Sequence, residues 1–367
     1  MHQPGLEQER RRCPPRPPGA GTCPQPSPPR AMATRWGICS AGRISHDFLV
    51  ALKTLPATEH KAVAIAARDL ARAQEYAQKH GIPRAYGSYE ELAQDPDVDV
   101  VYVGVINPEH LPVGRLFLGA GKHVLLEKPL GMNTAEVREL VQLAQSQGVF
   151  LMEAFWTRFF PISEQIRQLL AQGAVGRGKA DLGDRGAPHG EHPPAGGEEA
   201  GGAAPSWTSA ATASSFASMV LAGERPESIV ASGFLYPSGV DETTSVILKY
   251  AGKRQAVVSC TMSVELPNQA WVCGTKGSIE LPAPWYAPTT MIVNHQRHEC
   301  PLPPAPQPLN FSNGTGMRYE AQHVRECLLR GLKESPIMSL ADSELVASIM
   351  DTVRQQLGVT FSEDQQG

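Results

Sequence analysis

The chain has 367 residues, enough for two domains of ordinary size, and 41% of them are hydrophobic and 19% charged. Its formal net charge of −4 at pH 7 gives no basic surface for nucleic acid or anionic lipid. The sequence contains no run of about 18 or more apolar residues, so it predicts no membrane-spanning helix. The seven cysteines are scattered without a C-x-x-C pair, which argues against a metal site or a disulfide framework and favours reduced thiols in a cytoplasmic protein.

Residues 1–31 are predicted to form a disordered, Pro/Arg-rich extension. Nine prolines and almost no large apolar side chain leave too little surface to bury against the entropy of the chain. The second methionine, Met32, comes just before the first predicted strand. We hypothesise that the folded protein starts at Met32, which mass spectrometry of the native N-terminus would test.

Residues 32–155 alternate between predicted strands and helices. Continuous apolar runs predict buried strands at residues 36–39, 61–69, 97–105, 123–129 and 149–153. Helical spacing separates them, with Gly81 as a C-cap and Asn133 or Thr134 as an N-cap. This alternation predicts an α/β fold with a doubly wound parallel sheet, a Rossmann domain whose ligand edge lies at the carboxyl ends of the strands.

The turn after the first strand, "CSAGRIS", is the candidate nucleotide-binding turn. Ser40, Gly42 and Ser45 occupy the three places of the G-x-G-x-x-G pattern, so one glycine remains, where a pyrophosphate needs close backbone approach. We expect Ser40 and Gly42 to contact a dinucleotide, together with Arg43 and Ile44 at the start of the helix. A tight strand–helix turn without a ligand is the alternative.

The end of the second strand, "AARD", bears on the choice of cofactor. An acid there favours NAD by binding the ribose 2′-hydroxyl, whereas an arginine favours the 2′-phosphate of NADP. Arg68 comes first, Asp69 follows it, and Arg72 lies one helical turn further on. We therefore predict NADP, with Arg68 and Arg72 as ligands of the cofactor, and keep a solvated surface pair as the alternative for Asp69.

The segment "LLEKPLG" carries the strongest sign of chemistry. Glu127 and Lys128 end a buried strand, where charged groups are costly unless they have partners, and Pro129 is a candidate for a cis peptide bond. Both residues are expected to line the cofactor cleft. Lys128 is predicted to hydrogen-bond a substrate hydroxyl and to help remove its proton as hydride leaves. A surface lysine after a strand is the alternative.

Three other places at the same edge are candidates. His110 in "VINPEH" is expected to contact cofactor or substrate, or else to be a surface residue at a helix start. Tyr102 lies within the preceding strand. It is a candidate to contact the cofactor, and packing in the core is the alternative. Residues 153–161, "EAFWTRFFP" with Arg158, form either an apolar substrate pocket or core between the domains.

Residues 156–365 are predicted to form a second domain for substrate binding and dimerisation. Four alternating segments from residue 226 to residue 281 predict an open, mostly antiparallel sheet that could pair with a second subunit. The helices predicted at residues 317–332 and 340–358 are expected to dock on the first domain.

These stretches together resemble the glucose-fructose oxidoreductase superfamily. The resemblance rests on "RWGICSAGRISHDF", "LLEKPLGMNTAEVREL", "FLMEAFWTRFFP" and "GTKGSIEL", and covers about residues 33–176 and 216–365. It implies a Rossmann domain followed by an α+β domain, and NADP as cofactor. It also implies oxidation of trans-dihydrodiols of aromatic hydrocarbons and of aldoses such as D-xylose, with a homodimer as the assembly.

Residues 177–215 do not fit the resemblance. The family carries an Asp-x-x-x-Tyr element, which serves proton transfer and substrate orientation, and those places fall on Trp207 and Ala211. Neither side chain can replace them. The segment is rich in Gly, Ala and Pro, so we expect the second domain to lose one strand and one core helix. A catalytically inactive nucleotide-binding relic is therefore the alternative function.

The genetic code points to a cause. Trp207-Thr208 must be encoded TGG-ACN, and reading from the last base of the Trp codon gives GAC, an aspartate codon. Ala211-Thr212 in the same shifted frame gives NAC, which permits tyrosine. We interpret 177–215 as an out-of-frame segment between two compensating frameshifts. Re-reading the genomic DNA across this interval would test the interpretation.

Overall fold

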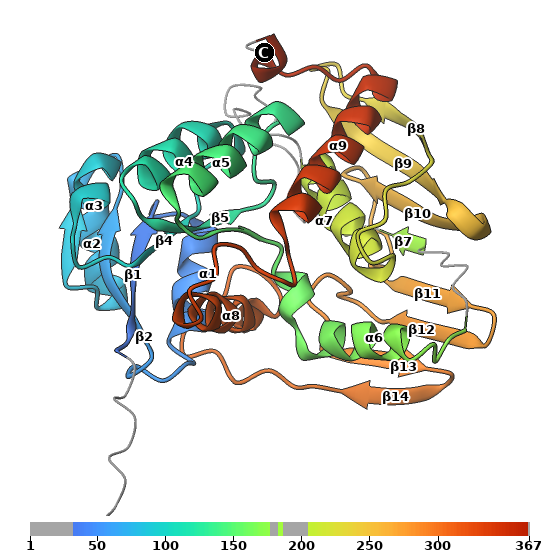
Figure 1. Ribbon diagram of the computed structural model, residues 1–367, viewed down its shortest axis with the longest axis horizontal. Helices are drawn as coiled ribbons and strands as arrows, with labels where there is room; N and C mark the ends of the chain where they lie inside the picture. The colour runs from blue at the N-terminus through green and yellow to red at the C-terminus, as the bar shows by residue number, and fades with distance from the viewer. Residues whose placement is uncertain (1–31, 177–182, 186–204, 366–367) are drawn as a thin grey trace, which may run out of the picture. The chain divides into compact units, whose positions relative to one another are not determined.

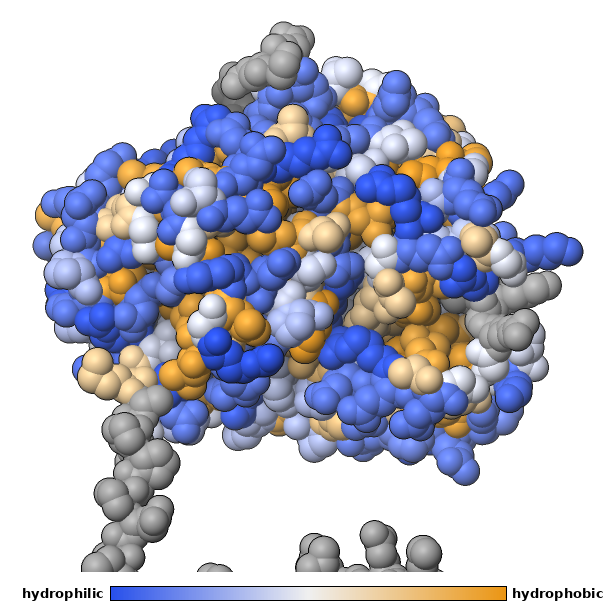
Figure 2. Space-filling view, viewed as in Figure 1, coloured by the Kyte–Doolittle hydropathy of each residue, from blue (hydrophilic) through white to orange (hydrophobic). Residues whose placement is uncertain are grey.

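The computed structural model describes residues 32–176, 183–185 and 205–365 (Figure 1). The predicted extension 1–31, and most of the segment 177–204, lie outside the described residues. Polar side chains cover much of the face seen in Figure 2, with apolar residues visible between them. Within the described ranges, no helix is both long and apolar enough to cross a bilayer.

The first half of the described chain forms a six-stranded parallel sheet in the order β3-β2-β1-β4-β5-β6. This order confirms the predicted doubly wound sheet. The short strand β3 was not predicted, because three half-buried residues carry no recognisable pattern. The strands are β1 (Thr34–Cys39), β2 (His60–Ala66), β3 (Arg84–Tyr86), β4 (Val100–Val103), β5 (His123–Glu127) and β6 (Leu151–Ala154).

Helices cover both faces of this sheet and leave its carboxyl edge open to the second domain (Figure 1). Gly81 ends α2 in the left-handed conformation with φ 70°, and the Asn133 side chain caps α5, as predicted. The helices are α1 (Arg43–Leu52), α2 (Leu70–His80), α3 (Tyr89–Gln94), α4 (His110–Gly119) and α5 (Thr134–Gln147), with a 3₁₀ turn η1 (Asn107–Glu109) before α4.

The described part of the second domain contains the predicted open, mostly antiparallel sheet, which confirms that prediction, and a second four-stranded sheet that was not predicted. The segment expected as a fourth strand forms the hairpin of β11 and β12, which belongs to the second sheet. In the first sheet, β7 pairs with β10 in parallel and the other pairs are antiparallel. The strands are β7 (Gly183–Arg185), β8 (Ser228–Leu235), β9 (Asp241–Tyr250), β10 (Arg254–Thr261), β11 (Ala270–Gly274), β12 (Gly277–Leu281), β13 (Thr290–Val293) and β14 (Gln296–Glu299).

The last two helices connect the domains. Helix α8 (Met317–Leu329) packs on α1. Helix α9 (Leu340–Leu357) packs on α5 on one side and on β8 and α7 (Pro205–Val220) on the other, which confirms the predicted docking. Helix α6 (Pro161–Ala171) follows the 3₁₀ turn η2 (Trp156–Phe159). Figure 1 shows α9 lying between α5 and the strands β8 and β9.

The expected loss of a core helix is wrong, because residues Pro205–Val220 form helix α7. Its sequence contains many alanines, which have the highest helix propensity. Ala210, Ala211, Ala213 and Ala217 are buried, and such small side chains allow α7 to approach α9 and β10 closely. Ser214, Ser215 and Ser218 of the same helix bond to neighbouring segments, as Ser218 does to Asp342 at 2.9 Å.

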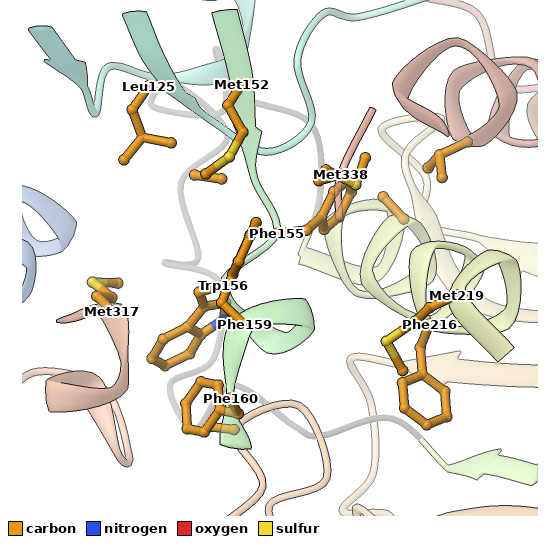
Figure 3. Packing of buried hydrophobic residues seen from close by; sticks show 14 of the residues in the cluster. Leu125, Met152, Phe155, Trp156, Phe159, Phe160, Phe216, Met219, Met317 and Met338 are labelled. Carbon is orange, nitrogen blue, oxygen red and sulfur yellow. The ribbon is translucent and has the colours of Figure 1, made fainter. Parts of the chain in front are cut away.

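An aromatic segment joins the two domains where the chain leaves β6. Figure 3 shows Phe155, Trp156, Phe159 and Phe160 between the strands of the first domain and Phe216 and Met219 of α7. Phe155, Phe159 and Phe160 are buried core residues, and the Trp156 ring reaches the main pocket. The interpretation of residues 153–161 as core between the domains is confirmed, and a substrate pocket at Trp156 stays a prediction.

Candidate functional site

The turn after β1 leaves room for a ligand at the start of α1. Ser40 has φ 89°, in the region that favours the glycine of the usual pattern. Gly42 has φ −96° and ψ 175°, which any residue adopts, and a Cβ built on it would lie 3.4 Å from Ser40 Oγ and 3.6 Å from Gly104 O. The protein alone would accept alanine at position 42, so the space above this glycine fits the close approach of a pyrophosphate.

The first turn of α1 has no side-chain cap and no acidic residue among the described residues. Its N–H groups and the positive end of its dipole therefore suit an anion. Ser45 is buried, and the Cβ of a residue larger than glycine at position 104 would lie only 2.7 Å from its hydroxyl. This end of α1 thus fits a dinucleotide.

Replacing Gly42 by alanine is expected to weaken the binding of a dinucleotide by about tenfold or more, since the new methyl group would fill the space that fits a pyrophosphate. The free energy of unfolding should fall by about 1 kcal/mol or less, because the cost is limited to the poorer N-cap. Fluorescence titration with NADPH and urea unfolding measure the two effects. Equal NADPH affinity in the two proteins would contradict a pyrophosphate site at Gly42.

One pocket, called the main pocket here because predicted site residues line it, has a volume of about 260 Å³ and lies between the carboxyl edge of the parallel sheet and the second domain. Ile44, Glu127 and Lys128, three of the predicted site residues, line it. Trp156 supplies one aromatic wall. The other lining residues are Val105, Asn107, Thr208, Ser209, Thr212, Trp285, Tyr286, Phe311 and Met317.

Glu127 is held at the end of β5 by buried partners. The Tyr102 hydroxyl donates a hydrogen bond of 2.6 Å to Glu127 Oε1, and the Lys128 N–H lies 3.3 Å from Oε2. Burial raises the pKa of Glu127, and these hydrogen bonds together with the Lys128 charge oppose the rise. Burial and the nearby Glu127 charge also raise the pKa of Glu320, a fully buried residue of α8, well above its ordinary value. Tyr102 therefore orients Glu127 from within the sheet.

Lys128 is half-buried and lines the pocket, so the alternative of an exposed surface lysine does not fit its position. The peptide bond between Lys128 and Pro129 is cis, as anticipated. Burial lowers the pKa of the Lys128 amine, and the charges of Glu127 and Glu153 raise it. A lysine with a lowered pKa beside a pocket can give and take a proton near neutral pH more readily than a solvated one.

His110 lies behind the pocket wall and is fully buried. Its Nδ1 is 2.6 Å from Pro129 O and its Nε2 is 3.2 Å from Val105 O. Burial lowers its pKa to about 4. The ring therefore connects the loops after β4 and β5, and this geometry favours a positioning role over contact with a reacting atom.

Three charged residues follow β2. Asp69 caps a helix, and Arg68 and Arg72 carry positive charges. The Asp69 carboxylate accepts the backbone N–H of Arg72 at 3.1 Å and caps α2, which gives it a structural role beyond the solvated surface pair. Arg72 donates from Nη2 to Ala41 O at 3.0 Å, within the nucleotide-binding turn. Arg68 is exposed, and no hydrogen bond or ion pair of its side chain appears among the described residues.

Helix α7 presents hydroxyl groups to the pocket. Thr208, Ser209 and Thr212 line it, whereas Trp207 and Ala211 line a second cavity of about 10 Å³ behind the loop after β5. Counting along the sequence placed the missing Asp and Tyr at 207 and 211, and in the folded chain those two positions face away from the pocket. One residue along a helix turns the side chain by about 100°, so positions 208 and 212 take the pocket face.

Phe311 reaches the pocket through contacts that span most of the chain. The Asp47 carboxylate on α1 accepts the backbone N–H groups of Asn310 and Phe311 at 2.9 and 2.8 Å. The exposed Arg43 guanidinium lies 5.7 Å from the centre of the Phe311 ring. Trp285 and Tyr286 come from the connection between β12 and β13. None of the three aromatic residues stood in a recognisable pattern, whereas Val105 and Asn107 lay within the segment "VINPEH" singled out from the sequence.

Comparisons with known proteins place this geometry in a family. Residues 34–155 match the family described as oxidoreductase family, NAD-binding Rossmann fold, and residues 163–280 match the GFO/IDH/MocA C-terminal domain. The chain is 58% identical over 330 residues to trans-1,2-dihydrobenzene-1,2-diol dehydrogenase of Xenopus tropicalis, covering 90% of this chain and 100% of that protein. The Homo sapiens protein of the same name is 50% identical over 336 residues, with 91% and 99% coverage.

Solved structures share the fold at lower identity. Levoglucosan dehydrogenase in complex with NADH and levoglucosan superposes with a TM-score of 0.75 at 20% identity, over 89% of this chain and 98% of that one. KijD10, a 3-ketoreductase from Actinomadura kijaniata in complex with NADP, gives a TM-score of 0.71 at 22% identity, with 88% and 98% coverage. From the family matches and the close relatives together, the chain belongs to the GFO/IDH/MocA family of oxidoreductases.

Proposed function

We propose that the site is built for an NADP-dependent dehydrogenase that oxidises trans-dihydrodiols of aromatic hydrocarbons and aldoses such as D-xylose. When bound, the nicotinamide would accept a hydride from the carbon that carries the substrate hydroxyl. Lys128 would take up the hydroxyl proton, with Glu127 beside it. Ser40, Gly42 and Ile44 would hold the cofactor at the start of α1, and Arg43 would flank it.

The placement of Lys128 carries this proposal. The amine lies at the carboxyl edge of the sheet, in a pocket walled by Trp156, Trp285 and Phe311. Such walls suit the ring of a dihydrodiol, since aromatic side chains offer large apolar surfaces for its hydrocarbon part. The hydroxyl groups that α7 contributes to the same pocket suit the hydroxyls of a sugar.

A second function, cofactor binding without turnover, is supported by the pocket face of α7. Thr208, Ser209 and Thr212 offer hydroxyls whose protons do not titrate near neutral pH, and no carboxyl or phenol comes from this helix. Proton transfer by a positioned side chain contributes about 10²–10⁴-fold to a rate. A chain that relies on Lys128 alone would therefore bind NADPH and oxidise alcohols slowly.

One assay separates the two functions. The purified chain is titrated with NADPH by fluorescence, and NADP reduction is followed with D-xylose and with trans-1,2-dihydrobenzene-1,2-diol. The Xenopus tropicalis relative, assayed in parallel, sets the scale. Turnover within about tenfold of the relative supports the dehydrogenase, and NADPH binding with turnover lower by about 10²-fold or more supports the inactive binder. A chain that binds no NADPH contradicts both.

Replacing Arg68 by alanine is expected to weaken NADPH binding by about tenfold and to leave NADH binding within about twofold, because only NADPH carries the 2′-phosphate. Arg68 suits this test because it is exposed, whereas Arg72 also supports the turn at Ala41. K79A, which removes an exposed cation from the last turn of α2, serves as the control. Equal losses for the two cofactors would argue against a role for Arg68 in NADP selection.

The proposed assembly is a homodimer through the outer face of the β8–β9 sheet. Val230, Phe234 and Ile247 are exposed on this face, with Phe234 74% exposed. Val230 and Ile247 are partners in the β8–β9 ladder, so their side chains form one apolar patch. Sedimentation velocity of the chain and of F234D tests the dimer; a parent chain that sediments as a monomer at micromolar concentration would contradict it.

The predicted reduced thiols support a cytoplasmic location, which cell fractionation would test.

A further inference from the structure

Glu153 of β6 lies beside Lys128 but outside the main pocket. It is 2% exposed, and its Oε1 accepts the backbone N–H of Leu130 at 2.8 Å, two residues after Lys128. Its neighbours Met152 and Ala154 belong to one core and Leu151 to the other. Because side chains alternate along a strand, Glu153 points to the Leu151 face of the sheet.

Glu127 approaches Lys128 from the opposite face. Leu125 shares the core with Tyr102, whereas Leu126 packs in the second core, so Glu127 projects on the Tyr102 side, where it accepts the Tyr102 hydroxyl. Lys128 begins the loop directly beyond the strand. Two buried carboxyl groups therefore flank this loop, one from each face of the sheet.

We propose that Glu153 is a positioning residue that holds the Lys128 loop from the face opposite to Glu127 and sets the charge state of the Lys128 amine. The hydrogen bond to Leu130 orients the loop that follows the lysine. The negative charge of Glu153 stabilises the ammonium form of Lys128. This inference deepens the proposed function and rests on it, since it concerns how the lysine of the proposed dehydrogenase is held.

The electrostatic surroundings are consistent with this role. Burial raises the pKa of Glu153 to about 7, and the Ser343 hydroxyl, the Leu130 N–H and the charges of Arg158 and Lys128 oppose the rise. Glu153 is therefore ionised above about pH 7, where it raises the pKa of Lys128, and protonated below it. Among the described residues, the other charged groups near Glu153 lie on three sides. Arg158 of η2 pairs with Asp342 of α9 at 3.4 Å, and Asp351 of α9 lines the second cavity. Glu136 of α5 holds the same loop, and Glu127 and Glu320 lie across the sheet.

The chain offers a matched control. Glu136 of α5 accepts the backbone N–H of Met132 at 2.8 Å, so it makes the same kind of bond to the same loop two residues further on. Its charge is not among the influences on the Lys128 pKa, which are burial, Glu127 and Glu153. In both E153Q and E136Q the amide oxygen can still accept the backbone N–H, so both variants remove the charge and add the same amide N–H donors.

The test measures the Lys128 amine directly, without cofactor or turnover. Competitive acetylation of the folded chain from pH 6 to pH 10, quantified by peptide mass spectrometry, reports the fraction of neutral amine. E153Q is expected to raise the labelling rate of Lys128 at pH 8 by about threefold or more, because loss of the nearby negative charge favours the neutral amine. E136Q should leave the rate within about 1.5-fold, and E153D, which keeps the charge, should label closer to the parent than E153Q does.

Superimposable labelling curves for the parent and E153Q would overturn the proposal, as would equal shifts in E153Q and E136Q. Circular dichroism and the labelling of distant lysines confirm that each variant is folded. If E153Q does not fold, the labelling of Lys128 in E153D is compared with that in the parent. A Lys128 labelling rate in E153D above that in E136Q would then contradict the role of the charge. NADPH titration of the same samples is independent of labelling. Failure to bind NADPH in the parent would count against the proposed function, whereas normal binding with unchanged labelling would count against Glu153 alone.

Discussion

The double variant T208D/T212Y is expected to reduce NADP with D-xylose about 10²-fold faster than the chain as it stands. Thr208 and Thr212 lie one helical turn apart on the pocket face of α7. A carboxylate and a phenol at these positions would line the same pocket as Lys128, where they could orient the substrate and share the hydroxyl proton. Initial rates of NADPH formation at saturating cofactor measure the gain.

The matched variant is W207D/A211Y, which follows from counting along the sequence. In the folded chain, both positions line the second cavity of about 10 Å³, which has no space for a phenol ring. Trp207 is 3% exposed, so an aspartate there would bury an unpaired carboxylate and should lower the free energy of unfolding by several kcal/mol. A gain in rate for W207D/A211Y and none for T208D/T212Y would show that α7 turns its other face to the substrate.

Replacing Lys128 by methionine is expected to lower turnover by about 10²-fold or more and to leave NADPH affinity within about threefold. Methionine keeps the length and apolar stem of lysine but cannot accept a proton. If the parent chain turns over too slowly to assay, the comparison is made in the T208D/T212Y background. A K128M variant with unchanged turnover would remove the central residue of the proposed mechanism.

The parent chain and K128M should also differ in the pH dependence of turnover. Oxidation of an alcohol needs a proton acceptor, so the reaction requires the neutral amine, and its rate should rise as the pH increases. Burial lowers the pKa of Lys128, so this rise should come below the pKa of about 10.4 of a solvated lysine. The kcat/KM profile of the parent should show this inflection, and K128M should lack it.

The sequence by itself determined the parallel sheet and the residues at its carboxyl edge. Alternating apolar runs and helical segments predicted the doubly wound order, and each strand end brought its residues to one edge, where Gly42 and Lys128 were found. Short-range patterns suffice for such inferences, because hydrogen bonding and side-chain alternation within a strand or helix depend on neighbouring residues. The caps at Asn133 and Gly81 were predictable for the same reason.

Only the tertiary structure decided which side chains close the pocket and which support it from behind. Phe311 depends on bonds to Asp47, 264 residues away, and Glu153 reaches the Lys128 loop only because β5 and β6 pair side by side. The face of α7 that meets the pocket is set by its packing on α9 and β10, and a turn of 100° per residue moves that face from 207 and 211 to 208 and 212. Contacts between distant segments leave no period in the sequence, so their outcome becomes visible only in the folded chain.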